Sequence, residues 1–186
     1  MSRFNHHKRV LALDVRPRSF GYAVFEGLNR ILDWGVRSYR KADGSVPAIV
    51  RKNVEQLIGD FAPGVLVIKD RWTQRGKTSP KLKKILAVVE QTAKKHRVPL
   101  RAISRKAVKK AFAGQGRVTK HSIATALASR YLELSWKLPP KRKPWQSEDY
   151  RMSIFDAAAL GFAYFEREAH PSGIASAGTS PPSPLA

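Results

Sequence analysis

The sequence predicts an α/β domain with a central mixed five-stranded sheet, three antiparallel strands followed by two parallel ones, flanked by helices. Two observations predict this fold class. Three apolar runs near the N-terminus are separated only by tight turns, which is typical of an antiparallel meander. Further along, two short apolar runs alternate with amphipathic helical patterns, which indicates parallel strands with helices between them.

Period-two patterns and short apolar runs define the expected strands. They are RVLALDV (9–15), FGYAVFEG (20–27), RILDWGVRSYR (30–40), VLVIKD (65–70) and VPLRAIS (98–104). The fourth run is almost continuously apolar, which fits a central strand covered on both faces. Apolar residues at helical spacing predict helices over 46–61, from the Ser79-Pro80 pair onward, and over 105–112, 120–131 and 153–168.

The ends of the chain differ in composition from its middle. Residues 1–8 are basic and are expected to be a flexible segment, and residues 9–168 form the expected single domain. Residues 169–186 end in PSGIASAGTSPPSPLA, which has no charged residue and many Pro, Ser, Gly and Ala residues. Such a segment cannot bury a core, so we expect a disordered tail.

Positive charge dominates the composition. Thirty-five Lys and Arg residues face 14 Asp and Glu residues, giving a formal net charge of +21. This excess favours a nucleic-acid partner over an anionic membrane surface. There is no cysteine, which excludes disulfides and thiolate metal sites. No apolar run approaches the length of a membrane span or of a signal-peptide core, so we expect a soluble cytoplasmic protein that does not bind membranes.

Asp14 is the first candidate for chemistry. It lies between aliphatic residues in VLALDV, where an ionised carboxylate costs several kcal/mol unless it is paired, hydrated or bound to a metal ion. The alternative is an exposed strand end at which Arg16 or Arg18 neutralises the carboxylate.

Two motifs resemble those of the RuvC-type Holliday-junction resolvases. LALDVRPRSFGYAVFEG resembles their first motif, in which an aspartate ends strand one and a Gly-Tyr pair opens strand two; these are Asp14, Gly21 and Tyr22. The spacing is one residue shorter here, and Arg16-Pro17 replaces a Pro-Gly pair. SIFDAAALGFAYF resembles the closing helix of that family, and Asp156 matches its aspartate. With the order of strands and helices, the resemblance extends over residues 10–166 and implies an RNase H-like fold.

The resemblance also implies a function. In that family, acidic residues hold two Mg²⁺ ions that activate water and stabilise the leaving oxygen during phosphodiester hydrolysis. It therefore implies a Mg²⁺- or Mn²⁺-dependent endonuclease that acts on branched DNA, with Asp14 and Asp156 as catalytic and metal-binding residues. We expect Asp70 to act with them, because it is the acid closest in the chain to the end of strand four. A homodimer is expected if the substrate is a four-way junction, because two strands are then cut symmetrically.

Two positions depart from the family pattern. The glutamate that closes strand four is replaced by Lys69, and the acid or histidine three residues before the final aspartate is Ser153. Asp70 follows Lys69, but alternation along a strand turns it to the opposite face unless the strand has ended or bulges there. Glu148 and Asp149 are further acids that can fold back toward the site. Asp156 itself has an alternative role, because Ser153-Ile-Phe-Asp156 fits a helix capping box.

The basic segments are interleaved with aromatic residues, which favours phosphate contacts with base stacking over a merely solvated surface. The expected nucleic-acid contacts are Arg16, Arg18, Lys69, Arg71, Arg75, Lys77, Lys141, Arg142 and Lys143.

Two other functions remain open. Lys69 supports a catalytically degenerate protein of this fold that binds DNA or RNA without cleaving it, and an accessory RNA-binding protein explains the charge equally well. An actin-like kinase is not expected. It would need a second nucleotide-clamping domain and a Gly-rich phosphate loop, and this sequence shows neither.

Overall fold

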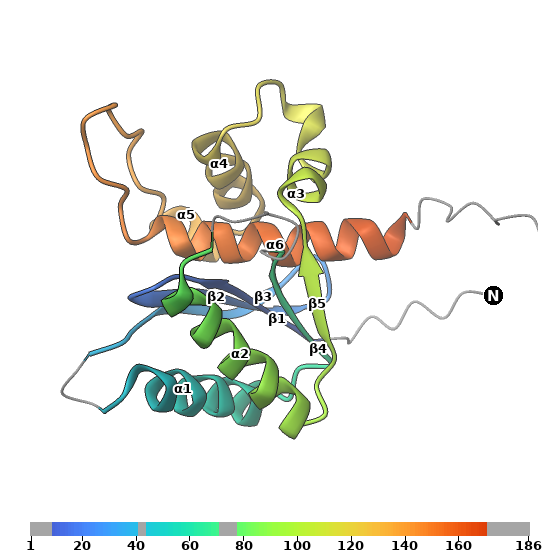
Figure 1. Cartoon of the computed structure of the whole chain (residues 1–186). Helices are drawn as coiled ribbons and strands as arrows, with labels where there is room; N and C mark the ends of the chain where they lie inside the picture. Colours follow the sequence, from blue (N-terminus) through green and yellow to red (C-terminus); the bar gives the residue numbers. More distant parts are fainter. Residues whose placement is uncertain (1–8, 41–43, 71–77, 171–186) are drawn as a thin grey trace, which may run out of the picture.

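A computed structural model describes residues 9–40, 44–70 and 78–170. Five strands form one sheet in the order β3-β2-β1-β4-β5 (Figure 1). The strands are β1 (Arg9–Val15), β2 (Ser19–Glu26), β3 (Ile31–Ser38), β4 (Val65–Lys69) and β5 (Leu100–Ile103). β1 pairs antiparallel with β2, and β2 with β3, whereas β4 runs parallel to β1 and β5 runs parallel to β4. The predicted mixed sheet is confirmed.

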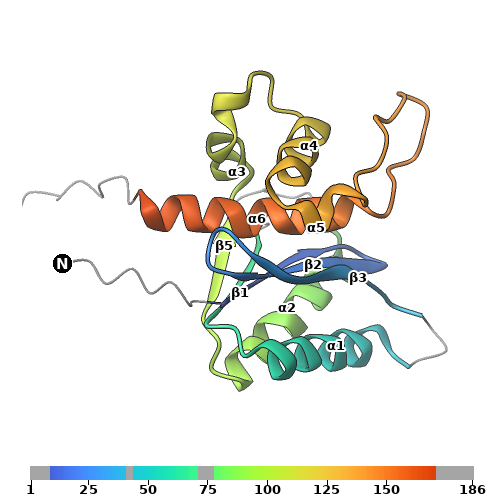
Figure 2. The same cartoon turned by 180° about the vertical axis from the view of Figure 1, so that it is seen from behind.

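Helices cover both faces of this sheet (Figures 1 and 2). On one face lie α1 (Val46–Phe61) and α2 (Pro80–Lys95), and on the other lies the long α6 (Met152–Ala169). The helices α3 (Arg105–Ala111) and α4 (Lys120–Arg130) pack on the far side of α6. A 3₁₀ turn, η2 (Ala113–Gln115), and one short helix, α5 (Leu132–Ser135), are additions to the expected elements.

Capping residues explain where four of the helices begin. Ser45, Ser79, Ser104 and Thr119 each have extended backbone and accept a hydrogen bond from the backbone N–H three residues later. A proline in the first turn of α1 and α2 supplies a preset φ at a position whose N–H needs no partner within the helix. These starts agree with the sequence prediction to within a residue.

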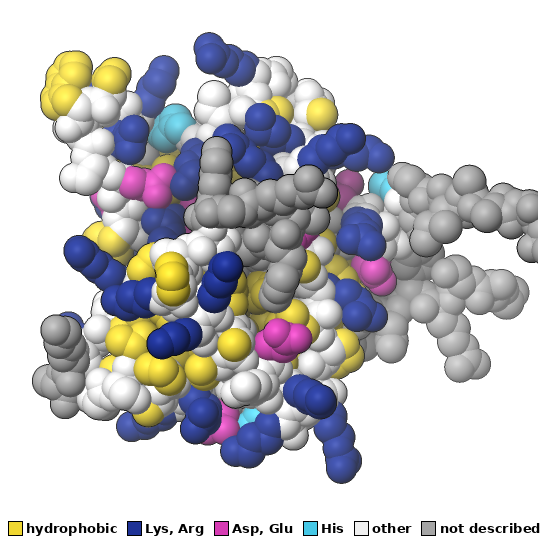
Figure 3. Space-filling model, in the orientation of Figure 1, with side chains coloured by type: hydrophobic (Ala, Val, Ile, Leu, Met, Phe, Trp, Pro, Cys, Tyr) yellow, Lys and Arg dark blue, Asp and Glu magenta, His cyan; other side chains and the backbone are white. Residues whose placement is uncertain are grey.

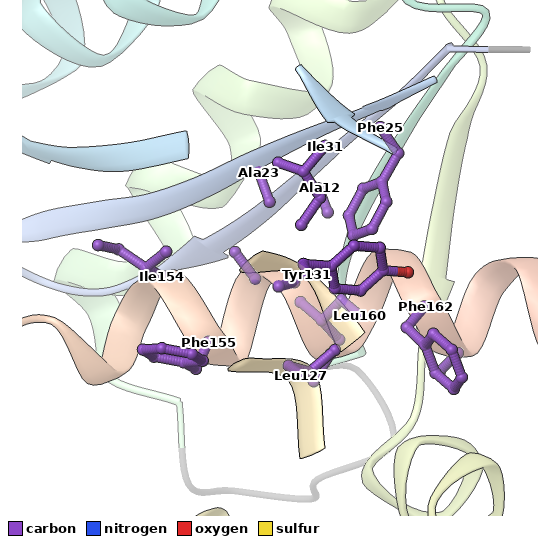
Figure 4. Close-up of a cluster of buried hydrophobic side chains, with 14 of the residues drawn as sticks. Ala12, Ala23, Phe25, Ile31, Leu127, Tyr131, Ile154, Phe155, Leu160 and Phe162 are labelled. Atoms are coloured by element: carbon purple, nitrogen blue, oxygen red, sulfur yellow. The ribbon is translucent and has the colours of Figure 1, made fainter. Parts of the chain in front are cut away.

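Alternation along β1 sorts its side chains between two cores. Leu11 and Leu13 belong to the core under α1 and α2. Val10 and Ala12 belong to the core under α6, where Phe25, Tyr131 and other large side chains of the sheet and helices meet (Figure 4). Asp14, two residues beyond Ala12, therefore faces α6.

None of the helices in the described ranges is both long and apolar enough to cross a bilayer. The expected flexible segment 1–8 and most of the expected tail, residues 171–186, lie outside the described residues.

Candidate active site

The ends of β1 and β4 place Asp14 next to Lys69. Leu13 pairs with Ile68 in the parallel register. The residues that follow them, Asp14 and Lys69, therefore lie side by side and face α6. Asp14 is only 3% exposed. Asp70, the residue after Lys69, donates its backbone N–H to the carbonyl of Ile103 at 2.8 Å, which extends the β4–β5 ladder by one residue. Alternation continues through such a ladder, so Lys69 and not Asp70 lies on the Asp14 face.

Gly21 lets α6 approach the sheet beside Asp14. It pairs with Asp14 across the antiparallel β1–β2 ladder. A Cβ atom on Gly21 would lie 2.2 Å from the carbonyl oxygen of Ser153, in the first turn of α6. Asp156 follows one helical turn later, so this close approach brings its carboxylate to the end of β1.

The capping role considered for Asp156 is wrong. The helix α6 begins at Met152, its N-cap is Arg151, and no side chain caps it. The hydroxyl of Ser153 instead donates to the carbonyl of Tyr150 at 2.8 Å. The Asp156 carboxylate is therefore free of the helix start and points to the site.

Two cations bridge three carboxylates at this site. Arg16 donates from Nε to Asp14 Oδ2, from Nη2 to Asp156 Oδ2 at 2.7 Å and from Nη1 to Glu148 Oε2 at 2.9 Å. Lys120 donates to Glu148 Oε1 at 2.6 Å and to Asp156 Oδ2 at 3.0 Å. We call these five side chains the ion-pair network. It joins β1, the turn after it, α4, the loop before α6, and α6 itself.

Glu148 and Asp149 are the two further acids expected to fold back toward the site. Of these two, Glu148 alone joins the ion-pair network. Asp149 pairs with Arg151 at 2.6 Å, outside the network. The alternative interpretation of Asp14 holds in part: Arg16 pairs with its carboxylate, but at a buried position and not at an exposed strand end.

Burial and pairing act in opposite directions on these groups. Burial, together with the nearby Asp156, raises the pKa of Asp14, and Arg16 and Lys69 offset this only in part. Burial would also raise the pKa of Glu148, but its hydrogen bonds and ion pairs with Lys120 and Arg16 outweigh it and lower that pKa. The pKa of Lys120 is raised, because Asp156 and Glu148 outweigh the effect of burial. Lys120 and Glu148 thus each favour the charged form of the other.

The residues present do not fit a pair of divalent ions. All three carboxylates of the network already accept from Arg16 or Lys120. With Lys69 acting on Asp14, three positive charges balance three negative ones, and two divalent ions would add charge that no further acid among the residues lining the described pocket offsets. Across residues 9–40, 44–70 and 78–170, no three acidic or histidine side chains converge as metal ligands.

A pocket of about 190 Å³ opens above Asp14 and Asp156. Basic side chains dominate its polar lining, and α3, α4 and α6 supply its apolar wall. It is lined by Asp14, Lys69, Arg105, Val108, Lys109, Val118, Thr119, Lys120, Ile123, Asp156, Ala159 and Leu160. The pocket therefore suits a phosphate group better than a cation. Arg105, Lys109 and Lys120 were not singled out from the sequence, where they resemble any surface cation.

The other expected contact residues lie at different places. Arg18 is exposed in the turn between β1 and β2, and Lys141, Arg142 and Lys143 are exposed in the loop before α6. Arg71, Arg75 and Lys77 lie outside the described residues. Lys and Arg side chains are spread over the face seen in Figure 3.

The sheet order, the helix layers and the site at the end of β1 together define an RNase H-like fold of the RuvC resolvase type. Thermus thermophilus RuvC in complex with a Holliday junction substrate has 19% identity and a TM-score of 0.67, over 88% of this chain and 96% of that one. The yeast mitochondrial Holliday junction resolvase has 17% identity and a TM-score of 0.59, over 88% and 80%. The Fowlpox virus resolvase, also solved with Holliday junction DNA, has 14% identity and a TM-score of 0.51, over 84% and 98%.

No protein-family model matches the sequence, and a search of the curated proteins found no match. The similarity to these resolvases is therefore one of fold.

Proposed function

We propose that the protein binds branched DNA with the basic surface around the Asp14 pocket and does not cleave it. The charge balance at the site carries this proposal. Arg16, Lys69 and Lys120 neutralise the three carboxylates, in a fold whose family implies acids that hold metal ions. Two neighbours of similar fold were solved with Holliday junction DNA, which supports a four-way junction as the ligand.

Phosphate contacts supply the binding energy in this proposal. The formal charge of +21 makes sequence-independent attraction to DNA strong and dependent on salt. Lys69, Arg105 and Lys109 line the pocket and are proposed to contact one phosphodiester group. The proposed contacts outside the pocket are Arg18, Arg71, Arg75, Lys77, Lys141, Arg142 and Lys143.

A homodimer is part of the proposal. A four-way junction has approximate two-fold symmetry, so two copies of one chain can bind equivalent strands. Analytical ultracentrifugation with and without junction DNA measures this stoichiometry.

A metal-dependent endonuclease is the second candidate. One observation favours it: a single guanidinium binds both Asp14 and Asp156, so two acids of the implied site do converge. In this alternative Asp14, Asp70 and Asp156 hold Mg²⁺ or Mn²⁺. It requires Arg16 and Lys120 to release their carboxylates and Asp70 to turn onto the Asp14 face.

One experiment separates the two candidates. A labelled four-way junction and a linear duplex of the same composition are incubated with wild type, Asp14→Asn and Lys69→Gln, in EDTA, Mg²⁺ or Mn²⁺. Binding is measured by fluorescence anisotropy and cleavage on a denaturing gel. An RNA four-way junction competes in a parallel titration.

The binding proposal expects wild-type protein to prefer the junction over the duplex in EDTA and to leave both strands intact with either metal. Lys69→Gln should weaken binding, because a phosphate contact is lost. Metal-dependent nicking that Asp14→Asn abolishes would establish the nuclease instead. Equal affinity for junction and duplex would refute branch recognition, and stronger competition by RNA would reassign the ligand.

A further inference from the structure

The loop between α5 and α6 carries an exposed tryptophan beside the site. This loop, residues 136–151, projects from the body of the molecule at the upper left of Figure 1, and hydrophobic side chains lie at its tip in Figure 3. Trp145 in this loop is 79% exposed. Its partner in the structure is the ammonium of Lys143, 5.6 Å from the ring centroid. An indole held in this way contributes little to the hydrophobic core.

A groove connects Trp145 to the Asp14 pocket. Its volume is about 830 Å³, and it runs from the start of α4 along the loop to Met152. It shares Thr119 and Lys120 with the pocket above Asp14. Ligand sites of roughly 300–1,000 Å³ take small organic molecules, so the groove has room for a nucleotide. We call it the loop groove.

Charge in the loop groove favours a nucleic-acid strand. Lys141 and Arg142 line it together with Trp145. Its acids, Glu148 and Asp149, already pair with cations of the protein, Glu148 with Arg16 and Lys120 and Asp149 with Arg151. A third hollow, over α4, shares Thr119, His121 and Lys141 with the loop groove and adds Arg117 and Arg130. A strand that leaves the Asp14 pocket thus meets cations along its path.

We propose that Trp145 stacks on an unpaired base that enters the loop groove, while Lys141 and Arg142 contact the phosphates beside it. Every base has a π-face, so such stacking is tolerant of sequence and requires only that the base is free of its pairing partner. A duplex offers no such base, whereas a single-stranded flap does, and a branch point offers one when a base pair beside it opens. This inference rests on the proposed binding of branched DNA and names the feature of the substrate that the loop recognises.

Trp136 provides a matched control. It is 66% exposed and has the ammonium of Lys137 3.9 Å from its ring centroid, as Trp145 has Lys143. Its ring also contacts Trp34, with centroids 5.3 Å apart, and it lines none of the three hollows. Trp136→Ala therefore removes an exposed indole that also contacts a Lys ammonium, and it leaves the residues of the loop groove unchanged.

The test uses 2-aminopurine, a fluorescent base whose emission is quenched by stacking, at successive unpaired positions of a forked DNA and of a single-stranded oligonucleotide. Wild type and Trp136→Ala should quench at one or two positions. Trp145→Ala should lose that quenching and bind the fork roughly 5- to 150-fold more weakly, the range that corresponds to one stacked base. Its affinity for a fully paired duplex should be unchanged, and circular dichroism checks that all three proteins fold.

Equal quenching by Trp145→Ala and wild type would overturn the inference while leaving branched-DNA binding intact. A loss of affinity for duplex equal to that for the fork would overturn it as well, because stacking requires an unpaired base. A change in oligomeric state of Trp145→Ala without DNA would reassign the indole to a protein interface. Quenching of the single strand without any preference for branched DNA would support the stacking site and refute only the proposed function.

Discussion

Replacing Gly21 with alanine is expected to push the first turn of α6 away from the sheet. The added Cβ would lie 2.2 Å from the carbonyl oxygen of Ser153 and 2.4 Å from its carbonyl carbon. Real Cβ atoms essentially never come within 3.0 Å of such neighbours. Because both atoms belong to the backbone, no rotamer change relieves the contact, and strand and helix must separate by about 1 Å.

This separation costs stability and disturbs the site. Overpacking costs about 1–3 kcal/mol, and we expect a value near the upper end because backbone must move. In a domain of this length about 3 kcal/mol lowers the melting temperature by roughly 6–12 °C. Asp156 lies one turn after Ser153, so Arg16 should no longer span the carboxylates of Asp14 and Asp156 with two good hydrogen bonds.

Urea unfolding followed by far-ultraviolet circular dichroism measures the effect. Gly59→Ala is the control, since Gly59 lies in α1 with no atom within 4 Å of an added Cβ. There the change should stabilise the protein by about 0.5–1 kcal/mol, because alanine is the better helix former. If Gly21→Ala is as stable as wild type, β2 and α6 do not approach as described and the placement of Asp156 is wrong.

Three further predictions concern charge, pH and a helix cap. Lys69→Glu should make the site net negative and raise its affinity for Mg²⁺ in isothermal titration calorimetry, whereas Lys69→Gln, which only removes the charge, should raise it less. Burial and the carboxylate of Asp33 raise the pKa of Tyr22 to about 12, so this neutral phenol favours the fold below pH 10 and that contribution is lost as pH rises from 10 toward 12. Tyr22→Phe should flatten the loss of unfolding free energy in that range, and an unchanged slope would contradict the assignment. Ser104→Ala should cost about 1 kcal/mol in thermal unfolding, because its side chain accepts from Ala107 N–H at the start of α3, and Ser104→Thr should restore most of it.

The sheet could be predicted from the sequence because the apolar pattern within each strand indicates which of its faces are buried. The almost continuous apolar run before Lys69 fits β4, a strand between two covered faces, and tight turns join the meander strands. The short α5 was missed for the opposite reason. Four residues are too few to show a helical period, and its start has no side-chain cap.

The site could be predicted only in part. Asp14 and Asp156 could be identified from motifs. Alternation along β4 also predicts that Lys69 faces Asp14 and that Asp70 faces away. Lys120 and the role of Glu148 depend on tertiary structure: the two residues are 28 positions apart, and each reaches Asp156 or Arg16 only after α4 and the loop have packed on α6. No local pattern distinguishes such a lysine from a solvated one.

The ion-pair network holds three close carboxylates together with charge that the chain itself supplies. Carboxylates this close repel one another, and burial makes the repulsion worse for Asp14. Arg16 and Lys120 supply the positive charge from within the chain and tie the end of β1 to α4 and α6. Divalent ions would otherwise have to provide that charge. If the protein binds DNA as proposed, binding should depend steeply on monovalent salt, through its phosphate contacts, and should not become stronger when EDTA is replaced by a Mg²⁺ buffer of equal ionic strength. Affinity that requires Mg²⁺ at matched ionic strength would show that the network opens to admit the ion.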